Sequence, residues 1–88
     1  MIEREVEIVN KLGLHARPAA EIVKTASKFQ CNVTLIRDDL EVNGKSIMGV
    51  MMLAAEFGST ITLRADGPDE EQAIEALAAL VASKFRER

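Results

Sequence analysis

The sequence predicts an α+β fold in which one four-stranded antiparallel sheet carries helices on one of its faces. Four segments alternate apolar and polar residues with the period of two that marks a strand with one face in water. Three other segments repeat their apolar residues with helical spacing instead. These segments follow one another in the order β-α-β-β-α-β-α, and four strands with one wet face each imply one antiparallel sheet with helices packed on its other side.

The composition predicts one small domain, residues 1–88. A chain of 88 residues that is 48% hydrophobic and has a net charge of −3 is typical of one folded globule. The negative charge and the absence of Tyr and Trp argue against nucleic-acid binding, and one His with one Cys cannot build a structural zinc site. No apolar run approaches the roughly 18–20 residues that span a bilayer, and the N-terminus lacks a signal-peptide pattern. We therefore expect a cytoplasmic protein without a metal, a cofactor or membrane insertion.

The alternating segments give the strands. The first is expected over residues 3–9, with Val6 and Ile8 on one face and glutamates on the other. The second and third strands form a hairpin around the turn at residues 37–39, and the fourth covers residues 60–65. Under this order of elements, the first and fourth strands are expected to pair in the interior of the sheet.

The first two helices are expected around Pro18 and after Ser46. Pro18 suits a first helical turn because its φ is fixed and it has no N–H to satisfy. The apolar stripe of that helix consists of Ala19, Ile22, Val23, Ala26 and Phe29. Ser46 suits the N-cap of a short helix over residues 47–53.

The last helix is expected to start at Asp69 and to run toward the C-terminus. Its buried stripe consists of Ala73, Ile74, Leu77, Leu80, Val81 and Phe85. Acidic residues fill its first turn, and Lys84, Arg86 and Arg88 lie near its end. This arrangement complements the helix dipole at both poles.

The only histidine, His15, lies just before the first helix in the segment Gly-Leu-His-Ala-Arg-Pro-Ala. The start of a helix attracts anions, since its first amides lack intrahelical partners and the dipole is positive there. Arg17 adds a guanidinium group whose geometry suits phosphate oxygens. Phosphoryl transfer chiefly needs positioning and charge stabilisation, so this arrangement predicts that His15 accepts a phosphoryl group. The alternative is a solvent-exposed loop histidine, and the convergence of Gly13, His15, Arg17 and Pro18 favours the acceptor.

The short helix is too apolar to have a full wet face. Val50 and Leu53 are expected in the core, which leaves four apolar side chains near the surface: Ile47, Met48, Met51 and Met52. Exposed Met and Ile predict an adaptable surface for more than one partner. The alternative is that these side chains fill an irregular core, and for Met52 the two interpretations stay open. Ser46 is either a purely structural cap or a place where the helix end tolerates an added phosphate.

Other reactive side chains give weaker signals. Cys31 is expected to be a small packing residue. No Ser, Cys or second carboxylate is placed to form a hydrolytic triad with His15, so a small hydrolase is disfavoured.

These motifs resemble those of a known family. The segment from Asn10 to Ala19, Asn-Lys-Leu-Gly-Leu-His-Ala-Arg-Pro-Ala, is similar to the active-site segment of the HPr family. HPr proteins are the histidine-containing phosphocarriers of the bacterial phosphoenolpyruvate-dependent phosphotransferase system. Lys-Ser-Ile-Met-Gly-Val-Met, residues 45–51, is similar to the family's regulatory segment. The resemblance runs essentially from end to end.

The resemblance implies an open-faced β-sandwich, a four-stranded antiparallel sheet covered on one face by three helices. It implies that His15 takes a phosphoryl group on Nδ1 from phospho-enzyme I and passes it to enzyme IIA components of sugar uptake, with Arg17 coordinating the phosphate. The protein is then a covalent carrier and not an enzyme, and a monomer that exposes its site to successive partners. The residues that match the family's docking surface are Leu14, Ala16, Ala20, Ile47, Met48 and Met51.

The resemblance also implies regulation. Ser46 matches the serine that an HPr kinase/phosphorylase modifies, and a transcriptional regulator is a further implied partner. The second hypothesis is therefore a regulatory binding module, of the nitrogen branch or Crh-like, although Crh-like regulators lack the active histidine. Two departures from the family concern the docking segment: Met-Met-Leu-Ala at 51–54 where sugar-type members read Met-Ser-Leu-Gly, and Gly44, which is expected to loosen the loop before Ser46.

Overall fold

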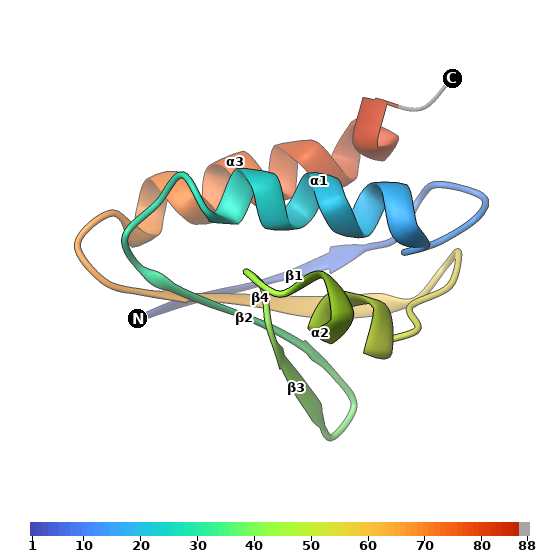
Figure 1. Ribbon diagram of the computed structural model, residues 1–88, viewed down its shortest axis with the longest axis horizontal. Helices are drawn as coiled ribbons and strands as arrows, with labels where there is room; N and C mark the ends of the chain where they lie inside the picture. The colour runs from blue at the N-terminus through green and yellow to red at the C-terminus, as the bar shows by residue number, and fades with distance from the viewer. Residues whose placement is uncertain (87–88) are drawn as a thin grey trace.

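The computed structural model describes residues 1–86, and its elements follow the predicted order (Figure 1). The elements are β1 (Ile2–Glu7), α1 (Ala16–Ala26), β2 (Asn32–Arg37), β3 (Leu40–Asn43), α2 (Ile47–Met52), β4 (Thr60–Asp66) and α3 (Glu70–Ala82), then a 3₁₀ turn at Lys84–Arg86. The sheet is antiparallel throughout, in the order β1-β4-β2-β3. The predicted α+β fold, an open-faced sandwich with a four-stranded antiparallel sheet and three α-helices, is confirmed.

The first strand lies at the edge of the sheet, so the prediction that it lies in the interior is wrong. Strand β1 pairs with β4 as expected, but β4 alone is the interior partner, because it also pairs with β2. The charged sequence of β1, Glu-Arg-Glu-Val-Glu after Ile2, suits an edge, where charges discourage pairing with other chains. The strand also ends at Glu7 and not at residue 9.

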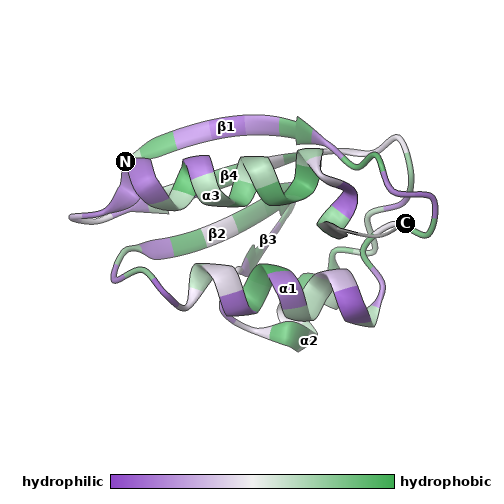
Figure 2. Ribbon diagram, turned by 90° about the horizontal axis from the view of Figure 1, so that it is seen from above, coloured by the Kyte–Doolittle hydropathy of each residue, from purple (hydrophilic) through white to green (hydrophobic). Residues whose placement is uncertain are grey.

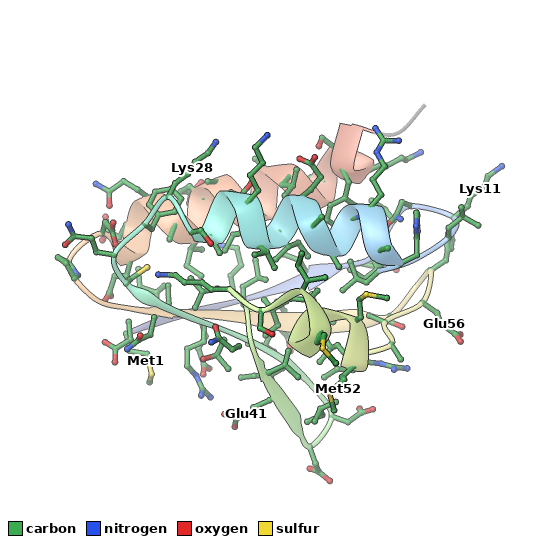
Figure 3. All side chains as sticks on the ribbon, viewed as in Figure 1. Met1, Lys11, Lys28, Glu41, Met52 and Glu56 are labelled. Carbon is green, nitrogen blue, oxygen red and sulfur yellow. The ribbon has the colours of Figure 1, made fainter. Side chains whose placement is uncertain are left out.

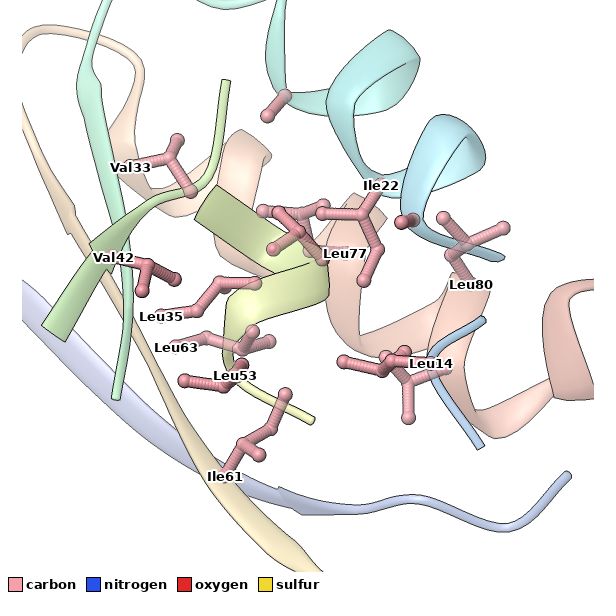
Figure 4. Close-up of a cluster of buried hydrophobic side chains, with 14 of the residues drawn as sticks. Leu14, Ile22, Val33, Leu35, Val42, Leu53, Ile61, Leu63, Leu77 and Leu80 are labelled. Atoms are coloured by element: carbon pink, nitrogen blue, oxygen red, sulfur yellow. The ribbon is translucent and has the colours of Figure 1, made fainter. Parts of the chain in front are cut away.

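Helices α1 and α3 lie next to each other over one face of the sheet, and α2 lies against α1 and β3 (Figure 1). Both long helices alternate hydrophilic and hydrophobic residues (Figure 2). Their apolar stripes meet the inner face of the sheet in one core. Ile22, Leu35, Leu63 and Leu77 are fully buried in it (Figure 4). The helices are thus fixed on a packed core, which leaves their outward faces and their ends exposed.

The other face of the sheet is wet, as the alternation predicted. Arg64 on β4 donates from Nε to Glu3 of β1 at 2.7 Å and from Nη1 to Glu41 of β3 at 3.2 Å. These side chains are partly or largely exposed, so water screens both pairs and each contributes little to stability.

The prediction that basic residues lie at the end of the last helix is wrong. Helix α3 ends at Ala82, before Lys84, and its last turn contains no basic residue. The Ser83 hydroxyl donates to the Leu80 carbonyl oxygen at 2.8 Å and so satisfies one of the carbonyls that the helix leaves without an amide partner. Lys84 and Phe85 then adopt left-handed φ values of 59° and 56°, which leave Phe85 1% exposed. The expectation for Arg88 lies outside the described residues.

Candidate functional site

His15 is the N-cap of α1, as predicted. Its main chain is extended, with φ −82° and ψ −172°, and its carbonyl oxygen accepts the N–H of Ala19 at 3.0 Å. Pro18 is the third helical residue, so it belongs to the first turn, where its lack of an N–H costs no intrahelical bond. The first-turn amides of Ala16 and Arg17 also lack acceptors four residues earlier within the helix. The positive end of α1 therefore begins directly at His15.

The two predicted chemical side chains differ in exposure. His15 is half-buried, whereas Arg17 is exposed on the first turn of α1. An exposed guanidinium can turn toward an anion that arrives at the start of the helix. The structure thus places Arg17 two residues beyond His15, on the element whose dipole favours negative charge.

A tight turn precedes His15. The N–H of Gly13 donates to the Asn10 carbonyl oxygen at 3.1 Å, and Gly13 has a left-handed φ of 69°. The Gly13 carbonyl oxygen accepts two bonds, from Asn10 Nδ2 at 2.8 Å and from the His15 N–H at 3.0 Å. Sequence reasoning treated residues 10–14 only as a loop and missed Asn10. An asparagine three residues before a glycine is the signal that could have indicated a side-chain-stabilised turn.

The loop after α2 supports this turn. The Leu14 N–H donates to the Ala55 carbonyl oxygen at 2.9 Å, and a Cβ on Gly13 would lie 2.5 Å from that same oxygen. Lys11 and Glu56 mark the two loops at one end of the molecule, where α1 begins (Figure 3). The loop that holds His15 and the loop that leaves α2 are therefore packed backbone against backbone.

Ser46 caps α2, as predicted. Its Oγ accepts the N–H of Gly49 at 3.1 Å. Val50 and Leu53 are buried, and the outward side chains are exposed to different extents: Ile47 45%, Met48 76%, Met51 43% and Met52 65%. The interpretation that these side chains fill the core is therefore wrong, Met52 included.

The residues that match the family's docking surface do not all reach the surface. Ala16 and Ala20 are exposed on α1, and Ile47, Met48 and Met51 are exposed on α2, which contacts α1. Leu14 differs, because it is only 5% exposed and belongs to the buried cluster (Figure 4). Its side chain anchors the loop before His15 in the core.

The loop before Ser46 is held more firmly than expected. The Gly44 N–H donates to the Val33 carbonyl oxygen at 2.8 Å, and a Cβ on Gly44 would lie 2.5 Å from the Val33 Cγ1. Lys45 Nζ donates to the Phe29 carbonyl oxygen at 2.7 Å. Gly44 thus permits a close approach to the side chain and carbonyl oxygen of Val33 and does not loosen the loop.

The rest of the described chain adds no second reactive centre. Cys31 is buried, as predicted, and its burial raises the pKa of the thiol, with the neighbouring Asp69 adding to the effect. Within residues 1–86, no three His, Cys, Asp or Glu side chains gather as a metal site. Across the same residues, no helix has both the length and the apolar character needed to cross a membrane.

Comparisons with known proteins agree with one another. A family model described as the PTS HPr component phosphorylation site matches residues 2–83. The chain is 53% identical over 87 residues to a phosphocarrier protein HPr of Cupriavidus necator, covering 99% of this chain and 98% of that one. It is also 49% identical over 81 residues to the HPr-like protein Crh of Bacillus subtilis, covering 92% of this chain and 95% of the relative.

Solved structures agree as well. The HPr-C-His structure from Thermoanaerobacter tengcongensis matches with a TM-score of 0.96 at 52% identity and covers 100% of this chain and 99% of that one. An HPr dimer from the same organism matches with a TM-score of 0.80 at 53% identity, covering 99% of this chain and 100% of that one.

Proposed function

The chain belongs to the HPr family, the phosphocarriers of the bacterial phosphotransferase system, and we propose that it carries its phosphoryl group on His15. The observation that carries this proposal is the place of His15 at the N-cap of α1, at the positive end of the helix. A phosphocarrier is a covalent relay and not a catalytic enzyme, so it needs an accessible nucleophile and no substrate pocket. A half-buried histidine at a helix end meets that need.

The transfer step forms a new N–P bond on His15. Nδ1 of His15 attacks the phosphorus of the phosphoryl group on enzyme I, which comes from phosphoenolpyruvate. The bond from phosphorus to the donor atom of enzyme I breaks as the new bond forms, and the donor atom keeps the electron pair. Arg17 and the first-turn amides stabilise the charge on the phosphoryl oxygens. Onward transfer follows the same pattern: a nucleophile of the enzyme IIA component attacks the phosphorus, the N–P bond to His15 breaks, and Nδ1 keeps the electron pair.

Partners dock beside His15 on an apolar surface, which we define as Ala16, Ala20, Ile47, Met48 and Met51. Its support is the contact between α1 and α2 and the exposure of these side chains. Methionine side chains adapt to different partner shapes, as a carrier that meets enzyme I and then IIA components requires. Leu14 has no direct part in this surface because its side chain is buried.

Regulation at Ser46 is the second part of the proposal. A phosphoryl group on Oγ would place about −1.5 to −2 charges within the apolar docking surface and so weaken docking. An HPr kinase/phosphorylase would add it, and a transcriptional regulator would bind the modified form. Ser46→Ala should abolish acid-stable phosphorylation by such a kinase with ATP and leave phosphoenolpyruvate-dependent phosphorylation in place. Loss of both modifications would contradict the separation of the two sites.

The alternative function is a regulatory binding module that acts through its phosphorylation state without relaying phosphate. The similarity to the HPr-like protein Crh supports this alternative. The presence of His15 favours the carrier, since Crh-like regulators lack this histidine. The two functions are compatible in one chain.

We further propose that residues 1–88 act as one phosphocarrier domain, as a cytoplasmic monomer. The family model that matches residues 2–83 supports the single domain. Successive docking at one site supports the monomer, although a related HPr has been solved as a dimer. Sedimentation of the chain should give the mass of one copy, and the mass of two copies would contradict the monomer.

The test of the proposed function is intact mass after incubation with phosphoenolpyruvate, Mg²⁺ and a bacterial enzyme I. The wild-type chain should gain one phosphoryl group that mild acid removes, as expected for a phosphohistidine. His15→Ala should gain none and keep its fold. An acid-labile phosphoryl group on His15→Ala would overturn the assignment, and no gain by the wild-type chain would favour the regulatory module.

A further inference from the structure

Asn10 is the one polar residue with a buried side chain among those the structure describes, at 2% exposure. Its Nδ2 donates to the Gly13 carbonyl oxygen at 2.8 Å, and its own carbonyl oxygen accepts the Gly13 N–H at 3.1 Å. Both hydrogen-bonding groups of Gly13 are therefore held by the same residue. The turn over residues 10–13 is fixed by a side chain and not by main-chain bonding alone.

The Gly13 carbonyl oxygen also accepts the N–H of His15, at 3.0 Å. A carbonyl oxygen has two lone pairs, so Asn10 and His15 together use its acceptor capacity. Displacement of this oxygen would change the direction in which the His15 N–H points, and with it the extended main chain from which the imidazole projects. Asn10 thus lies two hydrogen bonds from the main chain of His15.

The fold satisfies only one of the two polar groups of the buried Asn10 side chain. Its Oδ1 is buried and has no hydrogen-bond donor among the described residues. A buried acceptor without a partner destabilises a fold, and an apolar side chain of similar size would avoid that loss. A buried acceptor without a partner at the base of a reactive loop calls for an explanation other than packing, and a positional role supplies one.

We propose that Asn10 is a positioning residue for the phosphoryl acceptor. Through the Gly13 carbonyl oxygen, it fixes the main chain of His15 so that the imidazole meets the incoming phosphorus along the line of attack. Asn10 touches no reacting atom, so its contribution is to geometry. The inference rests on the proposed role of His15 as the acceptor.

The test compares Asn10→Leu and Asn10→Ala with the control Asn32→Leu, which makes the same change at an exposed asparagine of β2. Enzyme I is assayed with each variant as its substrate. Asn10→Leu should unfold in urea close to the wild type, because the loss of the Nδ2 bond to Gly13 is offset by the loss of the buried unpartnered oxygen. Its kcat should fall at least about tenfold, since small misplacements of reacting groups slow transfer by such factors. KM should change less than about twofold, because the docking surface is untouched.

Asn10→Ala removes the same donor with no demand for space, so the test does not depend on whether leucine fits. It should be less stable than Asn10→Leu and show the same fall in kcat. Asn32→Leu should match the wild type in kcat and KM. Wild-type kcat in both Asn10 variants would overturn the proposal.

A second readout does not depend on phosphorylation. Hydrogen exchange of the His15 amide should accelerate at least about tenfold in Asn10→Leu, while the amide of Leu63 in the core exchanges as in the wild type. Unchanged exchange at His15 would overturn the proposal. A wild-type chain that takes no phosphoryl group would instead refute the proposed function, and the amide exchange would then decide whether Asn10 holds the loop.

Discussion

The main-chain N–H of Leu14 donates to the carbonyl oxygen of Ala55 at 2.9 Å. This bond joins the loop that precedes His15 to the loop that follows α2. The segment proposed to carry the phosphoryl group is therefore linked by a main-chain hydrogen bond to the loop that follows the helix proposed to dock partners. Substitutions that disturb the contact between these two loops are expected to affect both stability and transfer.

Gly13→Ala should destabilise the fold by disturbing the contact between these two loops. Gly13 has a φ of 69°, and an added Cβ would lie 2.5 Å from the Ala55 carbonyl oxygen. Gly58→Ala is the matched control, because Gly58 has a φ of 88° with nothing within 4 Å of its Cβ. Urea unfolding should show a loss of about 1–2 kcal/mol for the control, from backbone strain alone. Gly13→Ala should lose clearly more, and equal losses in the two variants would contradict the close packing at Ala55.

Arg37→Met should weaken docking. Arg37 Nη1 donates to the carbonyl oxygens of Leu53 and Ala54, at 3.1 and 3.0 Å, and so holds the end of α2. Loss of these bonds should cost about 1–3 kcal/mol in urea unfolding, as expected for bonds from a charged donor. It should also raise the KM of enzyme I for the chain, since α2 carries much of the docking surface.

Arg64→Met is the control for this effect. Arg64 lies on the wet face of the sheet, where its ion pairs with Glu3 and Glu41 are partly or largely exposed. Its replacement should change stability much less than the replacement of Arg37, because water screens exposed ion pairs, and should leave KM unchanged. A KM that rises equally in both variants would indicate a general charge effect and not a role for Arg37 at α2.

The carboxylate of Asp69 should make the free energy of unfolding fall as the pH becomes acidic. Its carboxylate accepts the N–H groups of Gln30 at 2.8 Å and Cys31 at 2.9 Å, and these bonds hold its pKa below the ordinary 3.8. A carboxylate with a lowered native pKa stabilises the fold above the ordinary pKa, and this contribution is lost as the pH falls through the native pKa. The stability advantage of the wild type over Asp69→Asn should therefore be constant at neutral pH and shrink below about pH 4. Urea unfolding at a series of pH values measures it, and an advantage that grows in acid would contradict the sign.

Arg17→Ala should slow transfer without loss of stability. The side chain is exposed on the first turn of α1, so urea unfolding should change by no more than about 0.5 kcal/mol. The rate of phosphorylation by enzyme I should fall, because one stabilising charge on the phosphoryl oxygens is gone. Lys24→Ala, an exposed cation in the last turn of the same helix, controls for general charge steering. Equal rates in Arg17→Ala and Lys24→Ala would remove Arg17 from the mechanism.

The elements with a clear period could be predicted from the sequence. The stripe that contains Ile22 placed α1 on the core, and the excess of apolar residues at 47–53 correctly indicated that α2 exposes part of them. Ser46 located the start of α2, and Pro18 marked the first turn of α1, which begins two residues earlier at Ala16, because capping and backbone preferences are local. The site depends on where these two helices begin, so the positions of His15 and Ser46 at the helix ends could be predicted from the sequence.

Features set by distant contacts could not be predicted in the same way. The place of β1 at the sheet edge depends on how β4 inserts between β1 and β2, which no single segment encodes. Leu14 lies in a loop without a period, so nothing local indicates that its side chain turns into the core. Ala54 adopts a left-handed φ of 51° directly after the C-cap of α2, a position that usually carries Gly, so an alanine there gave no local signal of the turn.

The most direct test of the phosphocarrier assignment is onward transfer. The chain, phosphorylated by enzyme I and freed of it, is mixed with an enzyme IIA domain, and the intact masses of both proteins are followed. The chain should lose one phosphoryl group as the IIA domain gains one, and His15→Ala treated in the same way should deliver none. A wild-type chain that keeps its phosphoryl group beside several active IIA domains would contradict the carrier role.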